Sequence, residues 1–285
     1  MSTETHQAPA AQQSRATEGK GTSFGRAVRS ETIKFTSVPS SLILLLTTLV
    51  IMIGIAAVAA WGIGSSQEAL SSDPEAAAAM GDMEALGNSI ASSGIMFSQL
   101  IVGSIGVLVM SSEFTTGMAR ATFAAIPKRF PVVLAKTLLV AVVSLVVTVV
   151  STLLAALVIM PILSNYSLEQ DLSSETFQRY LWIGAAYVAV IALLGMSLGG
   201  LLRNSAGAIV TLVGIVFVLP NVLALITNDF IQDASRFLPD AAFGNLIGAT
   251  PAEGALEQWQ SGVVLGLWAL VPVVVTLLVI RRRDV

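Results

Sequence analysis

The sequence predicts an all-α polytopic membrane protein with six transmembrane helices, both termini in the cytoplasm, and an amphipathic N-terminal helix at the membrane interface. Hydrophobic residues make up 54% of the 285 residues and charged residues only 12%, about half the charged fraction of a typical soluble domain. Six apolar stretches are long enough to cross a bilayer, and the basic residues fall almost entirely on one side of them. A single water-soluble core could not bury this much apolar surface.

A helix needs about 20 mostly apolar residues to cross the roughly 30 Å hydrocarbon core. Six stretches meet this requirement, at about 42–63, 90–110, 132–161, 180–202, 206–227 and 262–280. Their centres lack charged side chains, and Lys136 and Arg203 stand at span ends. The third stretch would be about 45 Å long at 1.5 Å per residue, so we expect it to tilt or protrude. Transmembrane β-strands are excluded, because they alternate in polarity and end after about ten residues.

The distribution of lysine and arginine predicts the orientation. All 15 basic residues except Arg179 and Arg236 lie before span one, between spans two and three, between spans four and five, or after span six. Because loops rich in Lys and Arg stay in the cytoplasm, we expect both termini there. The polar, charged lead before span one and the lack of a small-residue cleavage pattern after it indicate a permanent helix, not a signal peptide.

The chain before the first span divides into two parts. Residues 1–22 are rich in Ser, Thr, Gln, Ala and Gly without apolar periodicity, which predicts a disordered cytoplasmic tail. Residues 23–39 are expected to form an amphipathic elbow helix with an apolar arc of about 100°. The apolar arc holds Phe24, Ala27, Val28, Phe35 and Val38, and the basic residues outside it are Arg26, Arg29 and Lys34. Glu31 falls on the apolar arc, against the pattern.

This helix is expected to lie on the cytoplasmic leaflet, with its basic side chains near the phosphates of the membrane lipid. The alternative is a solvated basic flank of the first span. Residues 40–285 then form the six-helix transmembrane domain. Its third outer loop, at about 228–260, contains the apolar stretch FLPDAAFGNLIGATP, which is too short to span and predicts short interfacial or re-entrant helices.

The sequence lacks the residue types and motifs that most classes of enzyme need for catalysis. The chain has no cysteine and a single histidine, His6, in the polar tail. No GxxxxGK[ST] loop for phosphate and no pair of carboxylates within a span occurs. We therefore expect no catalytic residue, no metal site and no cofactor in this chain, and no nucleic-acid partner.

Two polar side chains fall inside predicted spans, Gln99 and Asn221. Each is expected to bond a neighbouring helix, and the alternative is that they line a substrate path. Three GxxxG patterns, at 195–199, 244–248 and 262–266, favour close helix packing within one chain over a dimer seam.

The loop between spans two and three carries the most informative pattern. A helix from Glu113 to about 125 would place Phe114, Met118, Ala121 and Ala125 on one face and Glu113 and Arg120 on the other, and Ile126-Pro127 would end it. Such a helix on the cytoplasmic face could pass the movement of a soluble partner into the bilayer. The alternative is a second helix that floats at the membrane surface.

At these residues the chain resembles the permease subunits of bacterial ABC transporters of the second exporter class. The resemblance rests on Ser-Glu-Phe-Thr-Thr-Gly-Met-Ala-Arg at 112–120, Ala-Ile-Pro-Lys-Arg at 125–129, Lys136, the basic helix before span one and the long last outer loop with Leu238-Pro239. It implies a transporter of two permease chains, as a homodimer or heterodimer, and two separate ABC ATPase subunits that bind ATP and magnesium.

The resemblance also assigns roles to residues of this chain. Residues 113–125 would be the coupling helix that enters a groove of the ATPase, and residues 24–38 the elbow helix. The ATPase contacts would be Glu113, Phe114, Thr115, Thr116, Gly117, Met118 and Arg120. The expected function is export of a hydrophobic or amphipathic substrate across the bacterial inner membrane. The alternatives are a membrane scaffold or assembly protein without a transport path, and a secondary transporter, against which the lack of charge within the spans counts.

Overall fold

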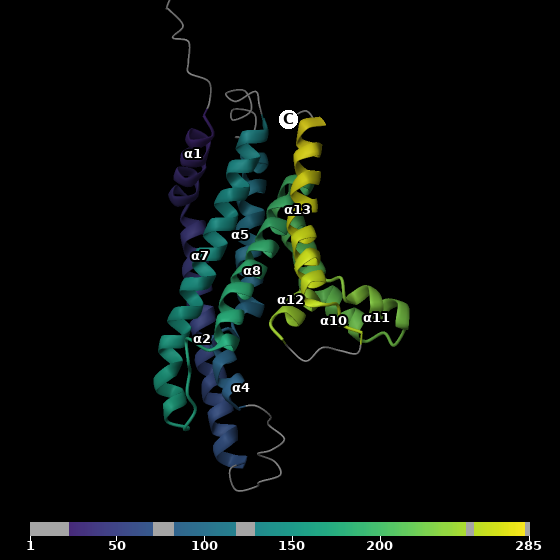
Figure 1. The fold of residues 1–285 in the computed structure, drawn as a ribbon. Helices are drawn as coiled ribbons and strands as arrows, with labels where there is room; N and C mark the ends of the chain where they lie inside the picture. Colours follow the sequence, from purple (N-terminus) through teal and green to yellow (C-terminus); the bar gives the residue numbers. More distant parts are fainter. Residues whose placement is uncertain (1–22, 71–82, 118–128, 249–253, 283–285) are drawn as a thin grey trace, which may run out of the picture.

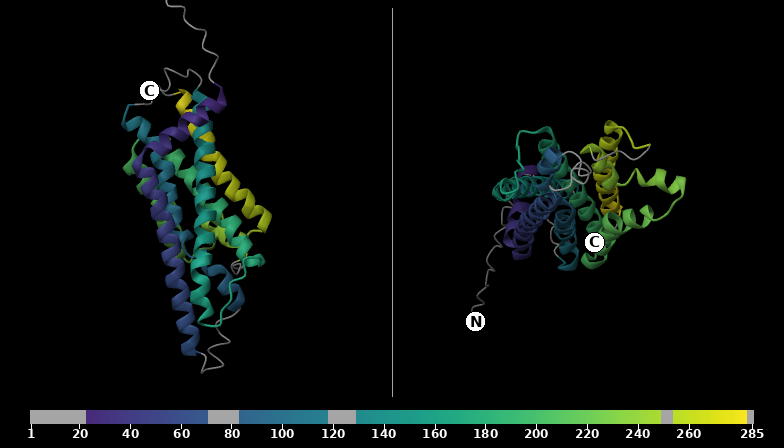
Figure 2. Two further views of the ribbon diagram at one scale, coloured as in Figure 1. Left: turned by 90° about the vertical axis from the view of Figure 1, so that its left-hand side faces the viewer. Right: turned by 90° about the horizontal axis from the view of Figure 1, so that it is seen from below.

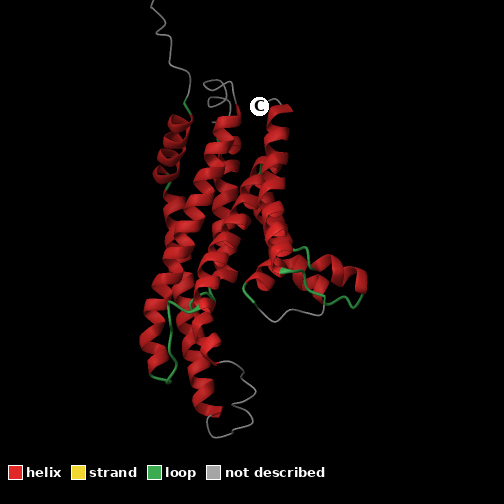
Figure 3. Cartoon of the chain, viewed as in Figure 1, coloured by secondary structure: helices red, strands yellow, loops and turns green. Residues whose placement is uncertain are grey.

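The computed structural model of the chain describes residues 23–70, 83–117, 129–248 and 254–282. Every regular element in these ranges is a helix, and none of the described residues forms a strand (Figure 3). The helices are α1 (Phe24–Ser37), α2 (Pro39–Leu70), α4 (Met83–Ile90), α5 (Ile95–Thr115), α7 (Arg129–Ser164), α8 (Glu175–Leu202), α9 (Ser205–Val213), the π-helical segment η1 (Gly214–Val218), α10 (Leu219–Ala224), α11 (Asp229–Ser235), α12 (Pro239–Leu246) and α13 (Gln258–Arg282).

Within the described ranges, six helical segments are long and apolar enough to cross a membrane, as the sequence predicts. They are Pro39–Ser66, Ala85–Thr115, Phe130–Ser164, Glu175–Leu202, Ser205–Ala224 and Gln258–Ile280. Most extend a few residues beyond the predicted ends, because a helix can continue past the hydrocarbon layer. The fifth is shorter and ends at Ala224 instead of about 227. The chain is therefore an all-helical protein of the multi-pass membrane type.

The bundle has two distinct ends (Figure 1). One end gathers α1, the end of α5, the start of α7 and the end of α13 near the C-terminus. The loop between α7 and α8 lies toward the opposite end, and the short helices α10, α11 and α12 project sideways from the bundle. In the view from below, α2 lies among the purple-to-teal segments on one side, while α10 to α13 lie on the other (Figure 2, right).

The α5–α8 contact forms the centre of the bundle. A Cβ atom added to Gly106 or Gly195 would collide with a carbonyl oxygen of the facing helix, and one added to Gly199 would lie 2.6 Å from the carbonyl oxygen of Val107. Glycines at these positions let the two backbones touch, as small residues do in membrane helix pairs. The GxxxG pattern at 195–199 is therefore used for packing within the chain, whereas Gly262 and Gly266 of α13 face open space among the described residues.

Span five contains a local change of helix type. Pro220 has no N–H group, and its ring would clash with the carbonyl of residue 216 in a regular α-helix. The helix is instead π-helical in η1, directly before Pro220, where the Leu219 N–H bonds to the Gly214 carbonyl five residues back. This extra residue per turn sets the directions of Phe217 and Asn221, which line the pocket described below.

Candidate functional site

Four charged side chains form a cluster at the end of the bundle that holds α1. Glu31 and Lys34 come from α1, Glu113 from the last turn of α5, and Lys136 from the second turn of α7. The Lys34 Nζ atom lies 2.9 Å from Glu31 Oε1 and 2.8 Å from Glu113 Oε1. The Lys136 Nζ atom lies 3.0 Å from Glu113 Oε1 and also contacts Glu31 Oε2. We call these four residues the ion cluster.

The ion cluster is largely removed from solvent. The side chains of Glu31, Glu113 and Lys136 are 4%, 6% and 3% exposed, and that of Lys34 is 30% exposed. Two acids and two bases balance in charge, and each carboxylate meets both ammonium groups. That geometry offsets the several kcal/mol per ion that desolvation costs.

The helical period explains how α1 supplies half of the cluster. Ala27, Glu31 and Phe35 are the buried residues of α1 and recur every four positions, so they share one face. Phe35 packs with Ile105 of α5 and Leu139 of α7. Glu31 lies between the two apolar residues because its partner is the buried Lys136, which accounts for its position against the predicted pattern.

The surroundings of Lys34 change its protonation. Burial lowers the pKa of Lys34, but the hydrogen bonds that its ammonium group donates to Glu113 and Glu31, with their negative charges, outweigh burial. The net pKa lies above the ordinary lysine value, so Lys34 is held in its charged form.

The last turn of α5 is also tied to the turn between α8 and α9. The Phe114 ring lies 4.9 Å from the guanidinium carbon of Arg203, at the distance of a cation–π contact. One turn earlier, the Ser111 hydroxyl is 2.8 Å from that of Ser205. Arg203 is the C-cap of α8 and has a left-handed backbone with φ of 53°. The end of α5 therefore contacts α1, α7 and the α8–α9 turn.

The coupling helix expected from Glu113 does not begin there. Glu113, Phe114 and Thr115 continue α5, and Thr116 is its C-cap. Gly117 follows with φ of 72°, a left-handed conformation typical of the glycine that ends a helix. The remainder of the expected helix, with the predicted contacts Met118 and Arg120, lies outside the described residues.

Of the residues predicted to contact the ATPase, some have side chains that face the protein interior and others are exposed. The Glu113 carboxylate faces Lys34 and Lys136 inside the protein, and Phe114 is half-buried against Arg203. Thr115 and Thr116 are exposed, and their hydroxyls bond to carbonyls of their own helix. Contact of these residues with an ATPase stays a prediction.

The residues predicted to face the membrane interface also divide. Phe24, Arg26 and Arg29 are exposed and Val28 is half-buried. Phe35 is buried against α5 and α7, and Lys34 belongs to the ion cluster. The ammonium group of Lys34 meets two carboxylates within the protein, and its contact with lipid phosphates stays a prediction.

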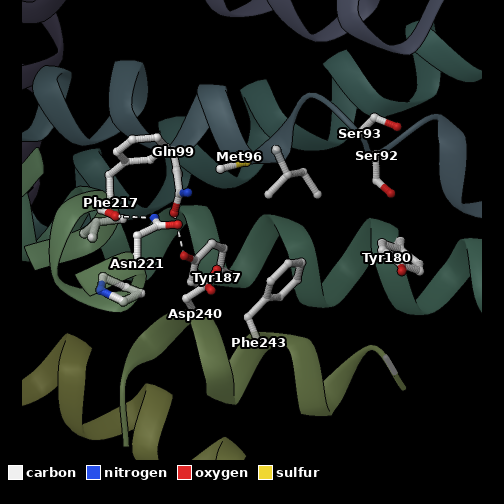
Figure 4. Close-up of a pocket in the computed structure, with 13 residues that line it drawn as sticks. Ser92, Ser93, Met96, Gln99, Tyr180, Tyr187, Phe217, Asn221, Asp240 and Phe243 are labelled. Carbon is white, nitrogen blue, oxygen red and sulfur yellow. Dashed lines mark hydrogen bonds between the residues drawn. The ribbon is translucent and has the colours of Figure 1, made fainter. Parts of the chain in front are cut away.

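The two polar residues within spans lie together at a pocket of about 250 Å³ between α5, α8, η1–α10 and α12 (Figure 4). Gln99 is buried and accepts a hydrogen bond of 2.5 Å from the Tyr187 hydroxyl of α8, so it links two helices. Asn221 is exposed and donates to the Phe217 carbonyl of its own helical segment at 2.6 Å. Asn221 thus has no bond to a neighbouring helix among the described residues, contrary to expectation.

Sequence reasoning did not predict the roles of five residues that the structure brings to these sites. Glu31 on an apolar arc and Lys136 in the first turns of span three were both signals of a buried pair, because an isolated charge is costly in an apolar environment. No local sequence signal distinguishes Arg203 from other basic residues at span ends, and none singles out Tyr187 within span four or Asp240 in the last outer loop. Among the described residues, no group of His, Asp and Glu is arranged to hold a metal ion.

Comparisons with known proteins give no family assignment. No protein-family model matches the chain, and no curated protein matches it at a significant level.

Proposed function

We propose that this chain is the permease subunit of an ATP-driven ABC exporter, moved by a separate ATPase subunit. The observation that carries the proposal is the ion cluster, which joins the elbow helix α1 and span three to the end of span two, directly before the loop that resembles the family. Three of the four charged side chains in the cluster are buried in an otherwise apolar bundle, which is costly, and a defined arrangement of these helices is a reason to keep them.

The sidedness follows from charge. The ion cluster lies at the end of the bundle where the basic loops converge, which is the cytoplasmic end by the positive-inside rule. Both termini are then cytoplasmic, α1 is the amphipathic elbow helix at the inner leaflet of a bacterial inner membrane, and Arg26 and Arg29 are its exposed basic residues.

The proposed coupling runs through the end of α5. ATP binding and hydrolysis in two ATPase subunits would displace the segment between α5 and α7 in each of two permease chains. Glu113 and Phe114 sit at the base of that segment and contact Lys34, Lys136 and Arg203. A displacement of the segment therefore acts on α1, on span three and on the α8–α9 turn together. In this proposal Glu113 positions the helix, while the exposed Thr115 and Thr116 are free to meet the partner.

Arg203 offers further support for a partner at this end. Its Nε and Nη2 atoms are buried and have no hydrogen-bond partner among the described residues. A guanidinium group favours a planar carboxylate acceptor. An acidic side chain brought in at the cytoplasmic end would satisfy these donors.

Co-purification tests the proposal. The neighbouring reading frames are searched for a soluble P-loop ATPase, the chain is expressed with it, the complex is isolated, and ATP turnover is measured in nanodiscs. We expect a stable complex, with turnover in it reduced by Glu113→Gln and by Phe114→Ala while insertion of both variants is retained. Glu175→Gln, which removes an exposed carboxylate paired with Arg179 near the opposite end of the bundle, is the matched control. An ATPase that neither binds the chain nor responds to either variant would contradict the proposal and leave the scaffold interpretation.

A further inference from the structure

The pocket at Gln99 and Asn221 is lined by an acidic side chain without a basic one. It contains one carboxylate, Asp240 in the first turn of α12, and no lysine or arginine lines it. Asp240 forms no ion pair with any described residue. Loss of hydration raises the pKa of the Asp240 carboxyl, although the residue is exposed at the rim. A cation placed beside it would favour the ionised form.

Two of the other polar side chains of the pocket have donors that are already engaged within the protein. The Asn221 amide nitrogen is used by the Phe217 carbonyl, which leaves the Asn221 side-chain oxygen as an acceptor. The Tyr187 hydroxyl is used as a donor to Gln99. Figure 4 shows Asn221, Tyr187 and Asp240 close to one another around the cavity. A cation would find a carboxylate there, whereas an anion would find no charged donor among the lining residues.

Aromatic rings surround these acceptors. Tyr187 and Phe243 are stacked, with ring centroids 4.4 Å apart and planes at 12°. Phe217 and Tyr180 also line the cavity. Aromatic faces attract ammonium groups, most strongly where water is partly excluded.

We propose that this pocket binds the head of a cationic amphiphile, a protonated or quaternary amine joined to an apolar body. The cavity of about 250 Å³ is smaller than the roughly 300–1,000 Å³ of sites for whole drug-sized ligands. It therefore holds the head alone, and the apolar body extends over the exposed rim residues Met96 and Phe217. This assignment rests on the proposed export function for its biological meaning and names its substrate class.

The test measures binding to the chain alone. The protein is placed in nanodiscs of zwitterionic lipid, and binding of labelled phenyltrimethylammonium is measured by equilibrium dialysis against empty nanodiscs. We expect saturable binding, weakened about tenfold by Asp240→Asn, which corresponds to one ion pair of about 1.4 kcal/mol. Its neutral isostere, tert-butylbenzene, should compete poorly. Asp233→Asn, which removes a carboxylate of α11 that pairs with Arg236 outside the pocket, should leave binding unchanged.

A second pair of variants covers the case in which Asp240→Asn fails to fold. Met96→Lys places an ammonium group at the rim and should block the probe by occupying Asp240. Phe97→Lys is the matched control, because Met96 and Phe97 are both 49% exposed on α5 but only Met96 lines the pocket. Absence of saturable binding to the wild-type chain, equal loss in Asp233→Asn, or equal competition by tert-butylbenzene would each overturn the inference.

The assay separates this inference from the proposed function, because it needs neither ATP nor an ATPase. Loss of the pocket's binding while an ATPase still associates would remove the substrate class alone. Binding at the pocket without any associated ATPase would remove the exporter assignment alone.

Discussion

Glu31 of α1 and Lys136 of α7 lie 105 positions apart in the sequence and form a buried ion pair. Glu113 of α5 and Lys34 of α1 complete the cluster around it. The N-terminal helix is thus attached to the bundle by charges as well as by Phe35. This attachment gives the first prediction.

Loss of Lys136 should destabilise the protein strongly. Lys136→Met leaves two buried carboxylates with only the half-exposed Lys34, and we expect a loss of about 3–5 kcal/mol in the free energy of unfolding. The measurement is thermal unfolding of the purified protein in detergent. Glu31→Lys and Lys136→Glu should each behave similarly, and the double variant should recover part of the loss because opposite charges again face each other. No recovery would indicate that the pair does not hold α1 to α7.

Raised pH should release Lys34. Its folded-state pKa lies above the ordinary value, so its contribution to stability is fully present below the unfolded pKa of about 10.4 and is lost as pH rises through the folded pKa. The groups that face Lys34 are the side chains of Glu31 on α1 and Glu113 on α5. Melting temperature measured from pH 9 to pH 12 should fall more for the wild type than for Lys34→Arg, because arginine keeps its charge. Equal alkaline profiles would contradict this role of Lys34.

A methyl group at Gly106 should separate α5 from α8. The added Cβ would meet the carbonyl oxygen of Ala192, and backbone cannot move aside as a flexible side chain can. We expect Gly106→Ala to cost about 1–3 kcal/mol of stability. Gly262→Ala is the control, since nothing described lies near its Cβ position. A loss of stability in the control equal to that in Gly106→Ala would show that the effect does not come from the helix contact.

Removal of the Phe114 ring should affect coupling more than stability. Phe114→Leu keeps apolar volume but removes the cation–π contact with Arg203, worth about 0.5–2 kcal/mol. In the complex with the ATPase, we expect ATP turnover in nanodiscs to fall at least about tenfold while the melting temperature changes little. Arg203→Lys should act in the same direction. A variant that melts early and turns over ATP normally would assign Phe114 to stability alone.

Hydropathy and charge counting determined the number of spans, because crossing a hydrocarbon layer needs a minimum length of apolar helix and that length is written locally in the sequence. The positions of lysine and arginine predicted that the basic loops lie on one side of the membrane. The GxxxG pattern predicted that Gly195 and Gly199 are packing positions. Expectations that depended on where a helix stops were less reliable. Glu113 was expected to open a new helix, but it lies in the last turn of α5, where its carboxylate pairs with Lys34 and Lys136.

Only the tertiary structure decided which charges meet and what surrounds them. Hydropathy reports depth along the membrane normal but not the rotation of each helix, so it could not direct Glu31 toward Lys136 or bring Asp240 beside Tyr187. Those encounters depend on contacts between segments separated by tens of residues in the chain. The ion cluster and the acidic aromatic pocket are therefore products of helix packing, whereas the six spans are products of composition.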